Sequence, residues 1–119
     1  MREIRFRGKR LDNGEWVTGC LKHVYRNDFP PEITSWTDAE GGYYRTDPVN
    51  PNTVGQYTGL KDEDGNEIYE GDIVSKEGFS PASVMFHDLR YYPTMMSIGC
   101  SVIGNIYDNP ELLDGGGQE

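Results

Sequence analysis

Residues 54–74 constrain the fold of this chain more than any other segment. They contain the turn-forming sequence Asp64-Gly65-Asn66 between two stretches of apolar and aromatic residues. Asp, Gly and Asn tolerate a positive φ, so this arrangement is typical of a β-hairpin. The side chains expected to be buried are those of Val54, Tyr57, Leu60, Ile68, Tyr69, Ile73 and Val74. The segment therefore predicts a domain built from β-strands.

Glycines punctuate this segment and the C-terminal part of the chain. Gly59 interrupts the alternation of the first strand, which indicates a bulge, and Glu70-Gly71-Asp72 indicates a corner before the next strand. Gly65 and Gly104 are expected at a turn or a site of tight packing, where a Cβ would collide. Such glycines serve the backbone, so their substitution should cost stability before function.

The N-terminus predicts a second hairpin, over residues 2–22. Ile4 and Phe6 alternate with Arg5 and Arg7, as in a half-buried strand. Asp12-Asn13-Gly14 is the strongest local turn signal, and a second strand follows over residues 15–21. Because side chains alternate across a strand, the arginines should lie on the wetter face, opposite Phe6.

The middle of the chain is less regular. Pro and Gly clusters break residues 24–52, where only short strands at 33–36 and 43–46 are expected. This region is a candidate for a mobile binding loop. Tyr25, Trp36, Tyr43 and Tyr91 could form an exposed aromatic patch or complete the core.

The C-terminal part is expected to contain a loop at 76–81, a strand at 82–87 and the last strands within 95–106. Asn109 and Pro110 favour the start of a short helical turn. The final residues, 115–119, are expected to be a disordered tail. The fold prediction is mainly β, at most α+β: a small, partly open SH3-like β-barrel with an N-terminal β-hairpin and a short C-terminal helical turn.

Length and composition favour one cytoplasmic domain over residues 1–114. The chain has 119 residues, and its fifteen glycines and seven prolines suit short strands and many turns. No apolar run approaches the ~20 residues needed to cross a bilayer. Cys20 and Cys100 are too few for a disulfide framework and are expected to act as small hydrophobic residues.

Charge is distributed unevenly along the sequence. The formal net charge is −9, which makes non-specific attraction to nucleic acid or anionic lipid unfavourable for the whole molecule. The first ten residues nevertheless carry five Lys or Arg side chains against Glu3. This basic strand could dock on an acidic neighbour, within the fold or in an oligomer, or could contact phosphate.

Three segments together resemble the YopX-like family of phage and prophage proteins. They are residues 54–74, residues 2–9 (REIRFRGK) and residues 102–113 (VIGNIYDNPELL). The resemblance implies a compact β-rich domain with a barrel-like portion, encoded by a phage or an integrated prophage. The biochemical role of the family is not established, so the resemblance supplies no catalytic residues.

No segment matches the pattern of a catalytic or metal site. The acidic cluster of residues 62–72 lacks the ligand spacing of a calcium loop and is expected to be a solvated turn. His23 and His87 are the only histidines, and neither forms a recognisable motif with Cys20 or Cys100. The sequence thus predicts no enzyme, no cofactor and no metal.

The preferred hypothesis is a non-enzymatic accessory protein that binds other proteins and copies of itself. Arg5, Arg7 and Trp16 of the hairpin are the candidate interface residues, because Trp and Arg are common interface anchors. One alternative is a nucleic-acid-binding module that uses the basic strand. Another is an acidic mimic of nucleic acid that acts on a host protein.

Overall fold

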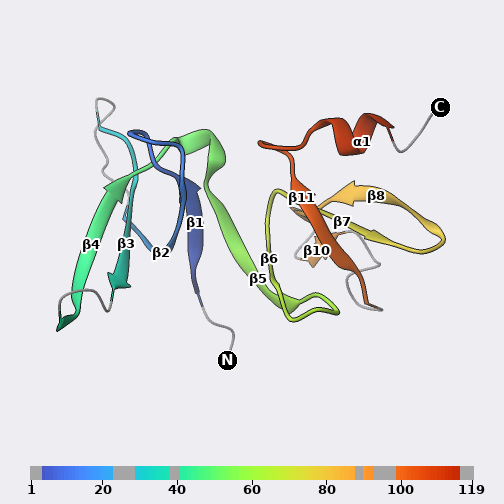
Figure 1. Ribbon diagram of the computed structural model, residues 1–119, viewed down its shortest axis with the longest axis horizontal. Helices are drawn as coiled ribbons and strands as arrows, with labels where there is room; N and C mark the ends of the chain where they lie inside the picture. Colours follow the sequence, from blue (N-terminus) through green and yellow to red (C-terminus); the bar gives the residue numbers. More distant parts are fainter. Residues whose placement is uncertain (1–3, 23–28, 38–40, 88–89, 93–98, 116–119) are drawn as a thin grey trace. The chain divides into compact units, whose positions relative to one another are not determined.

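The protein consists of two compact units, Met1–Gln56 (unit 1) and Tyr57–Glu119 (unit 2) (Figure 1). The computed structural model describes residues 4–22, 29–37, 41–87, 90–92 and 99–115. Almost all regular structure in this part of the chain is β-strand, which confirms the mainly β prediction. The described sheets are not closed, and the SH3-like form of the barrel stays a prediction.

Unit 1 is an antiparallel sheet with the strand order β4-β3-β2-β1. A 3-10 turn, η2, and the start of β5 beside β1 complete it. The elements are β1 (Phe6–Lys9), β2 (Trp16–Lys22), β3 (Glu32–Thr37), β4 (Tyr43–Pro48), η2 (Pro51–Thr53) and β5 (Gly55–Lys61). The N-terminal hairpin is confirmed, and so are the short strands expected at 33–36 and 43–46, which are the slightly longer β3 and β4.

One face of the unit 1 sheet forms its core. Ile33 and Val49 are fully buried there, and a Cβ on Gly8 would lie 3.1 Å from Val49 and 3.3 Å from Ile33. Phe6 is only half-buried, and Ile4 precedes β1 with 70% of its surface exposed. The expectation that Ile4 would help to form a half-buried strand is therefore wrong, because β1 begins after it.

Unit 2 contains the β5–β6 hairpin, a three-stranded sheet β11-β7-β8 and a two-stranded sheet β10-β9. The elements are β6 (Glu67–Tyr69), β7 (Asp72–Lys76), β8 (Phe79–Ser83), β9 (Met85–His87), β10 (Arg90–Tyr92), β11 (Ser101–Asn105) and the helix α1 (Glu111–Gly115). Glu77 and Gly78 make a tight turn between β7 and β8, so the loop expected at 76–81 is wrong.

The core of unit 2 contains most of the residues that the 54–74 pattern selects. Ile68 and Val74 are fully buried and pack in one cluster with Val84 and Cys100. Leu60 is an exception at 43% exposure. Gly59 has a φ of 88°, and the β5–β6 register shifts between Tyr57 and Lys61, so the predicted bulge turns Leu60 outward.

The C-terminal segment forms the predicted short helix. Asn109 precedes α1, and its side chain accepts a hydrogen bond from the backbone N–H of Asn105 at 3.2 Å. A Cβ on Gly104 would lie 2.6 Å from Asn109 Oδ1, which confirms tight packing at this glycine. The helix ends at Gly115, the first residue of the expected tail; residues 116–119 lie outside the described part of the chain.

Asp62 organises the β5–β6 turn. Its Oδ1 accepts from the backbone N–H groups of Asp64 and Asn66, and its Oδ2 accepts from the backbone N–H of Val102. The side chain is buried, as is that of Asp72, which accepts from the N–H of Tyr69. The expectation of a wholly solvated acidic turn is therefore wrong, because these two carboxylates satisfy backbone donors.

Substitution of Gly19 should destabilise unit 1. A Cβ at this position would overlap the carbonyl oxygen of Thr34 on β3, so Gly19→Ala would have to separate β2 from β3. We expect a loss of about 3 kcal/mol in the free energy of unfolding, measured with denaturant. Gly14→Ala is the control, because nothing lies within 4 Å of its added Cβ and only backbone strain of about 1 kcal/mol remains. Equal costs for both variants would contradict the close approach.

Substitution of Asp62 should destabilise unit 2 and change its response to acid. Burial tends to raise the pKa of Asp62, but hydrogen bonds from Val102, Asn66 and Asp64 outweigh burial and hold the pKa below its ordinary value of 3.8. The resulting stability is fully present above pH 3.8 and is lost as the pH falls through that value toward the lower pKa of the folded protein.

We therefore expect Asp62→Ala to lower the free energy of unfolding by about 3 kcal/mol at neutral pH, because it leaves buried donors unsatisfied. The variant should also show less loss of stability on acidification than the wild type. Asp64→Ala is the matched control, since Asp64 is exposed, and should change stability by about 0.5 kcal/mol or less. Parallel acid-unfolding curves for Asp62→Ala and wild type would contradict this account.

Candidate binding face

The strand register of unit 1 places cationic, aromatic and hydroxyl side chains together on the face opposite the core. Directly paired residues in an antiparallel sheet share a face, and the pairs include Lys9 with Trp16, Cys20 with Thr34, and Trp36 with Tyr44. We call this surface the basic face. Its members are Arg5, Arg7, Lys9, Trp16, Thr18, Cys20, Thr34, Trp36, Tyr44 and Thr46.

The predicted interface residues Arg7 and Trp16 are in contact. The guanidinium carbon of Arg7 lies 4.6 Å from the centre of the Trp16 ring, and Lys9 Nζ lies 5.6 Å from it. Both separations are within the range of cation–π attraction. Lys9 was predicted to lie on the same side as Arg5 and Arg7 as part of a nucleic-acid surface, but not as a protein-interface residue, and the register places it opposite Trp16.

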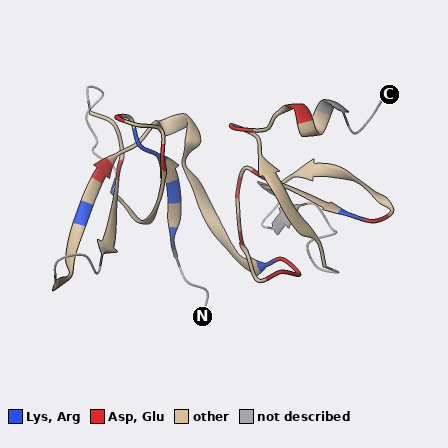
Figure 2. Ribbon diagram, in the orientation of Figure 1, with Lys and Arg blue, Asp and Glu red and all other residues tan. Residues whose placement is uncertain are grey.

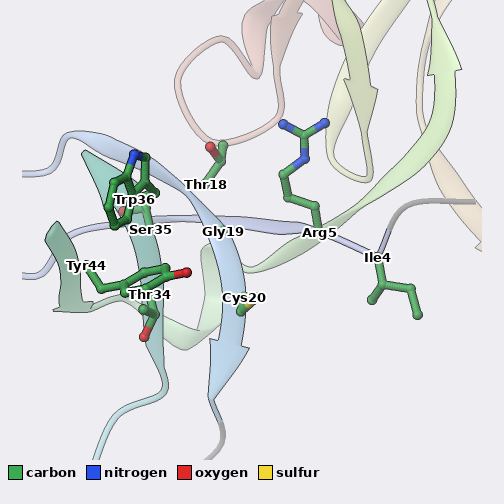
Figure 3. Close-up of a pocket in the computed structure, with 9 residues that line it drawn as sticks. All are labelled: Ile4, Arg5, Thr18, Gly19, Cys20, Thr34, Ser35, Trp36 and Tyr44. Carbon is green, nitrogen blue, oxygen red and sulfur yellow. The ribbon is translucent and has the colours of Figure 1, made fainter. Parts of the chain in front are cut away.

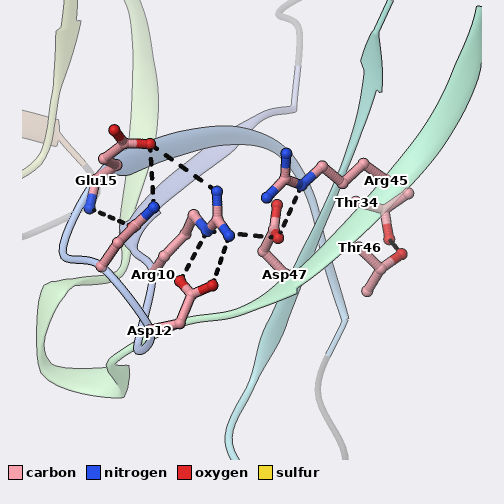
Figure 4. A network of polar contacts seen from close by, with 8 residues as sticks. Arg10, Asp12, Glu15, Thr34, Arg45, Thr46 and Asp47 are labelled. Carbon is pink, nitrogen blue, oxygen red and sulfur yellow. Dashed lines mark hydrogen bonds and ion pairs between the residues drawn. The ribbon is translucent and has the colours of Figure 1, made fainter.

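Arg10, the last cation of the N-terminal strand, serves the hairpin turn (Figure 4). Its Nη2 lies 2.6 Å from Asp12 Oδ2 and its Nε lies 3.5 Å from Asp47 Oδ1, which Arg45 also contacts at 3.0 Å. The hydrogen bond from Arg10 holds the pKa of Asp12 below its ordinary value. Arg10 therefore stabilises the turn, and Arg5, Arg7 and Lys9 supply the cations of the basic face.

A pocket of ≈ 380 Å³ opens on the basic face (Figure 3). The chain before β1 contributes Ile4 and Arg5, and β2 contributes Thr18, Gly19 and Cys20. Figure 3 shows Arg5 on one side of the pocket, with Thr18 and Cys20 between it and the far wall. Arg5, a predicted interface residue, thus lines a concave site.

The far wall of the pocket comes from β3 and β4. Thr34, Ser35, Trp36 and Tyr44 line it. The rings of Trp36 and Tyr44 meet edge to face, with centroids 5.0 Å apart and planes at 72°, and they are 56% and 72% exposed. Trp36 was considered from the sequence for an exposed aromatic patch, whereas Tyr44 was not considered, because only the pairing of β3 with β4 brings it beside Trp36.

The aromatic patch considered from the sequence is reduced to Trp36 in the described structure. Tyr43 pairs with Thr37, one position away from the Trp36–Tyr44 pair, so it lies on the opposite face. The side chain of Tyr91 lies outside the described part of the chain, as do Tyr25 and residues 24–28 and 38–40 of the expected loop. Trp36 gains Tyr44 as its aromatic neighbour instead.

The two cysteines differ in environment. Cys20 is exposed in the pocket, whereas Cys100 is buried in the core of unit 2, and both are free thiols. The expectation of a small hydrophobic role is confirmed for Cys100 and wrong for Cys20. Cys20 pairs directly with Thr34 of β3, so both side chains lie on the basic face.

The described residues contain no group of three or more His, Cys, Asp or Glu side chains that could hold a metal ion. His23 and the side chain of His87 lie outside the described part of the chain. In that same part, no helix has the length and apolar character required to cross a membrane.

Comparison with known proteins identifies the family and the fold. The YopX protein family matches residues 5–97, and the chain belongs to this family. The crystal structure of protein EF1440 from Enterococcus faecalis is similar, with a TM-score of 0.60 and 24% sequence identity. The similarity covers 95% of this chain and 99% of EF1440 and shows a shared fold. The search of curated proteins gave no match.

Thiol labelling should distinguish the two cysteines. In the folded protein we expect an aromatic disulfide reagent to modify Cys20 rapidly and Cys100 only after unfolding, because Cys100 is 2% exposed. Burial, together with the charges of Asp62 and Glu63, also raises the pKa of the Cys100 thiol. Cys20→Ser should abolish the fast reaction and Cys100→Ser should leave it intact. A fast reaction that persists in Cys20→Ser would contradict the placement of Cys20.

Proposed function

We propose that this YopX family protein is a non-enzymatic accessory protein of a phage or prophage, acting in the cytoplasm of the bacterial host. Its role is to bind proteins, including further copies of itself, through the basic face. A small, partly open SH3-like barrel remains the arrangement that we expect around this face. Family membership and the fold shared with EF1440 support the assignment to this group of proteins.

The observation that carries the proposal is the segregation of charge between the two units (Figure 2). Residues 1–56 contain eight Lys or Arg and eight Asp or Glu, and so have no net charge. Residues 57–119 contain three Lys or Arg and twelve Asp or Glu, which accounts for the whole net charge of −9. An acidic unit on one molecule complements the basic face of another.

The chemistry of the basic face suits a protein interface. Trp16 presents a large ring beside the cations Arg7 and Lys9, and Trp and Arg carry much of the binding energy at interfaces. Trp36 and Tyr44 add exposed aromatic surface on the same face. In such an interface the aromatic side chains bury apolar surface against the partner, and the surrounding charged residues speed and orient its approach.

Nucleic-acid binding is the second candidate, and the row of Arg5, Arg7 and Lys9 beside aromatic rings favours it. The net charge of −9 opposes it, because the whole molecule repels phosphate at long range. The strongly acidic unit 2 also fits a mimic of nucleic acid, but that idea rests on charge alone. Association between protein surfaces uses both charge distributions and is preferred.

The test is the oligomeric state as a function of salt. We expect light scattering after size exclusion to give an oligomer at micromolar concentration in low salt, which dissociates as salt screens the charges. Arg7→Gln and Trp16→Ala should each weaken association by about tenfold or more. Lys61→Gln removes the same charge from the acidic unit and should not weaken it. Thermal unfolding of each variant controls for loss of fold.

The proposal would be overturned if the protein is a monomer at every salt concentration and a pull-down also finds no specific partner. A specific partner is one that immobilised wild-type protein retains and that Arg7→Gln does not. Binding of single-stranded DNA that falls steeply with salt and with loss of Arg5 and Arg7 would instead support the second candidate.

A further inference from the structure

We infer that the pocket on the basic face binds a nucleotide, a planar base joined to an anionic phosphate. This inference goes beyond the proposed association between proteins and rests on the lining of the pocket alone. The volume of ≈ 380 Å³ lies within the range of about 300–1,000 Å³ found for small-molecule sites.

The aromatic wall of the pocket suits the base. Trp36 and Tyr44 expose 56% and 72% of their surface although they contact each other, so both rings retain area for stacking. The indole of Trp36 rests against Gly42, where a Cβ would lie 2.5 Å from the ring. Gly42 therefore makes room for the indole and supports it. A ring held in this way is prepared for stacking before the ligand arrives.

The opposite wall suits the phosphate. Arg5 lines that side, and a guanidinium can donate two parallel hydrogen bonds to phosphate oxygens. The hydroxyl of Thr18 lies between the two walls and can hydrogen-bond a sugar. Because β1 and β3 are two strand spacings apart, ~10 Å, a single nucleotide can reach from the aromatic wall to Arg5.

The combination of walls selects this ligand class over simpler ones. A bare anion would use Arg5 but leave the aromatic wall exposed, and an uncharged aromatic compound would use the aromatic wall but form no charged contact with Arg5. The described lining includes no Asp or Glu that would repel phosphate. Recognition by stacking tolerates any base, so we expect little preference among the bases.

Two probes already present in the protein report on the pocket. Trp16 and Trp36 are its only tryptophans, and both lie on the basic face. Cys20 is an exposed thiol in the pocket lining. Titration with AMP should quench tryptophan fluorescence to saturation and slow the labelling of Cys20 by a thiol reagent. Orthophosphate alone and adenosine alone should each bind at least tenfold more weakly.

Variants separate the two walls. Measured by protection of Cys20 and by calorimetry, Trp36→Ala and Arg5→Gln should each raise the Kd for AMP by about tenfold. Tyr43→Ala is the matched aromatic control, because Tyr43 lies on the opposite face, and Lys61→Gln is the matched charge control in unit 2. Both controls should bind AMP as the wild type does.

A second arm distinguishes a free nucleotide from a nucleotide within a strand. Stronger protection of Cys20 by a short oligodeoxyadenylate than by AMP would assign the site to single-stranded nucleic acid, and equal or weaker protection would assign it to free nucleotides. Absence of protection by both ligands, or AMP binding unchanged in Trp36→Ala and Arg5→Gln, would overturn the inference. Light scattering on the same samples reports association separately, so failure of one proposal does not imply failure of the other.

Discussion

The register of the unit 1 sheet is the constraint on which the candidate site depends. A shift of one residue in the pairing of β1 with β2 would move Arg7 and Trp16 to opposite faces and would expose the side now packed around Ile33 and Val49. Two features stabilise this register. The ion pair between Arg10 and Asp12 stabilises the turn that joins β1 to β2, and the close approach of Gly19 to Thr34 fixes β2 against β3. The binding face is thus a consequence of how the core is buried.

Local signals in the sequence predict much of the fold. The hairpin around Gly65 and the corner at Gly71 follow from turn residues next to buried strands, because both depend on neighbours in the chain. The β7–β8 hairpin was missed since its turn is only Glu77 and Gly78, and the residues after it alternate poorly in burial. The strand β4 was expected only at 43–46, and its burial gives no alternation that would mark its full length, because its first four residues are all exposed.

The candidate site is less predictable than the fold. Arg7 and Trp16 could be paired from the sequence because a short turn connects their strands. The aromatic wall could not, since Trp36 and Tyr44 belong to strands whose place in the sheet depends on long-range pairing with β2. The exposure of Cys20 was also not foreseen, although Cys20 lies four residues after Trp16 on β2 and therefore shares its face. The sequence also did not show which acidic residues are buried. Asp62 is buried and accepts hydrogen bonds from backbone N–H groups, whereas its neighbour Glu63 is exposed.

The central claim is that the basic face is the surface through which this protein binds others. Amide chemical shifts followed by NMR over a dilution series at low salt test it most directly. The account predicts concentration-dependent shifts in β1 to β4 at positions facing Trp16 and Trp36, together with shifts at acidic residues of unit 2. Shifts confined to other surfaces, with the amides of Arg7, Trp16 and Trp36 unchanged, would contradict it.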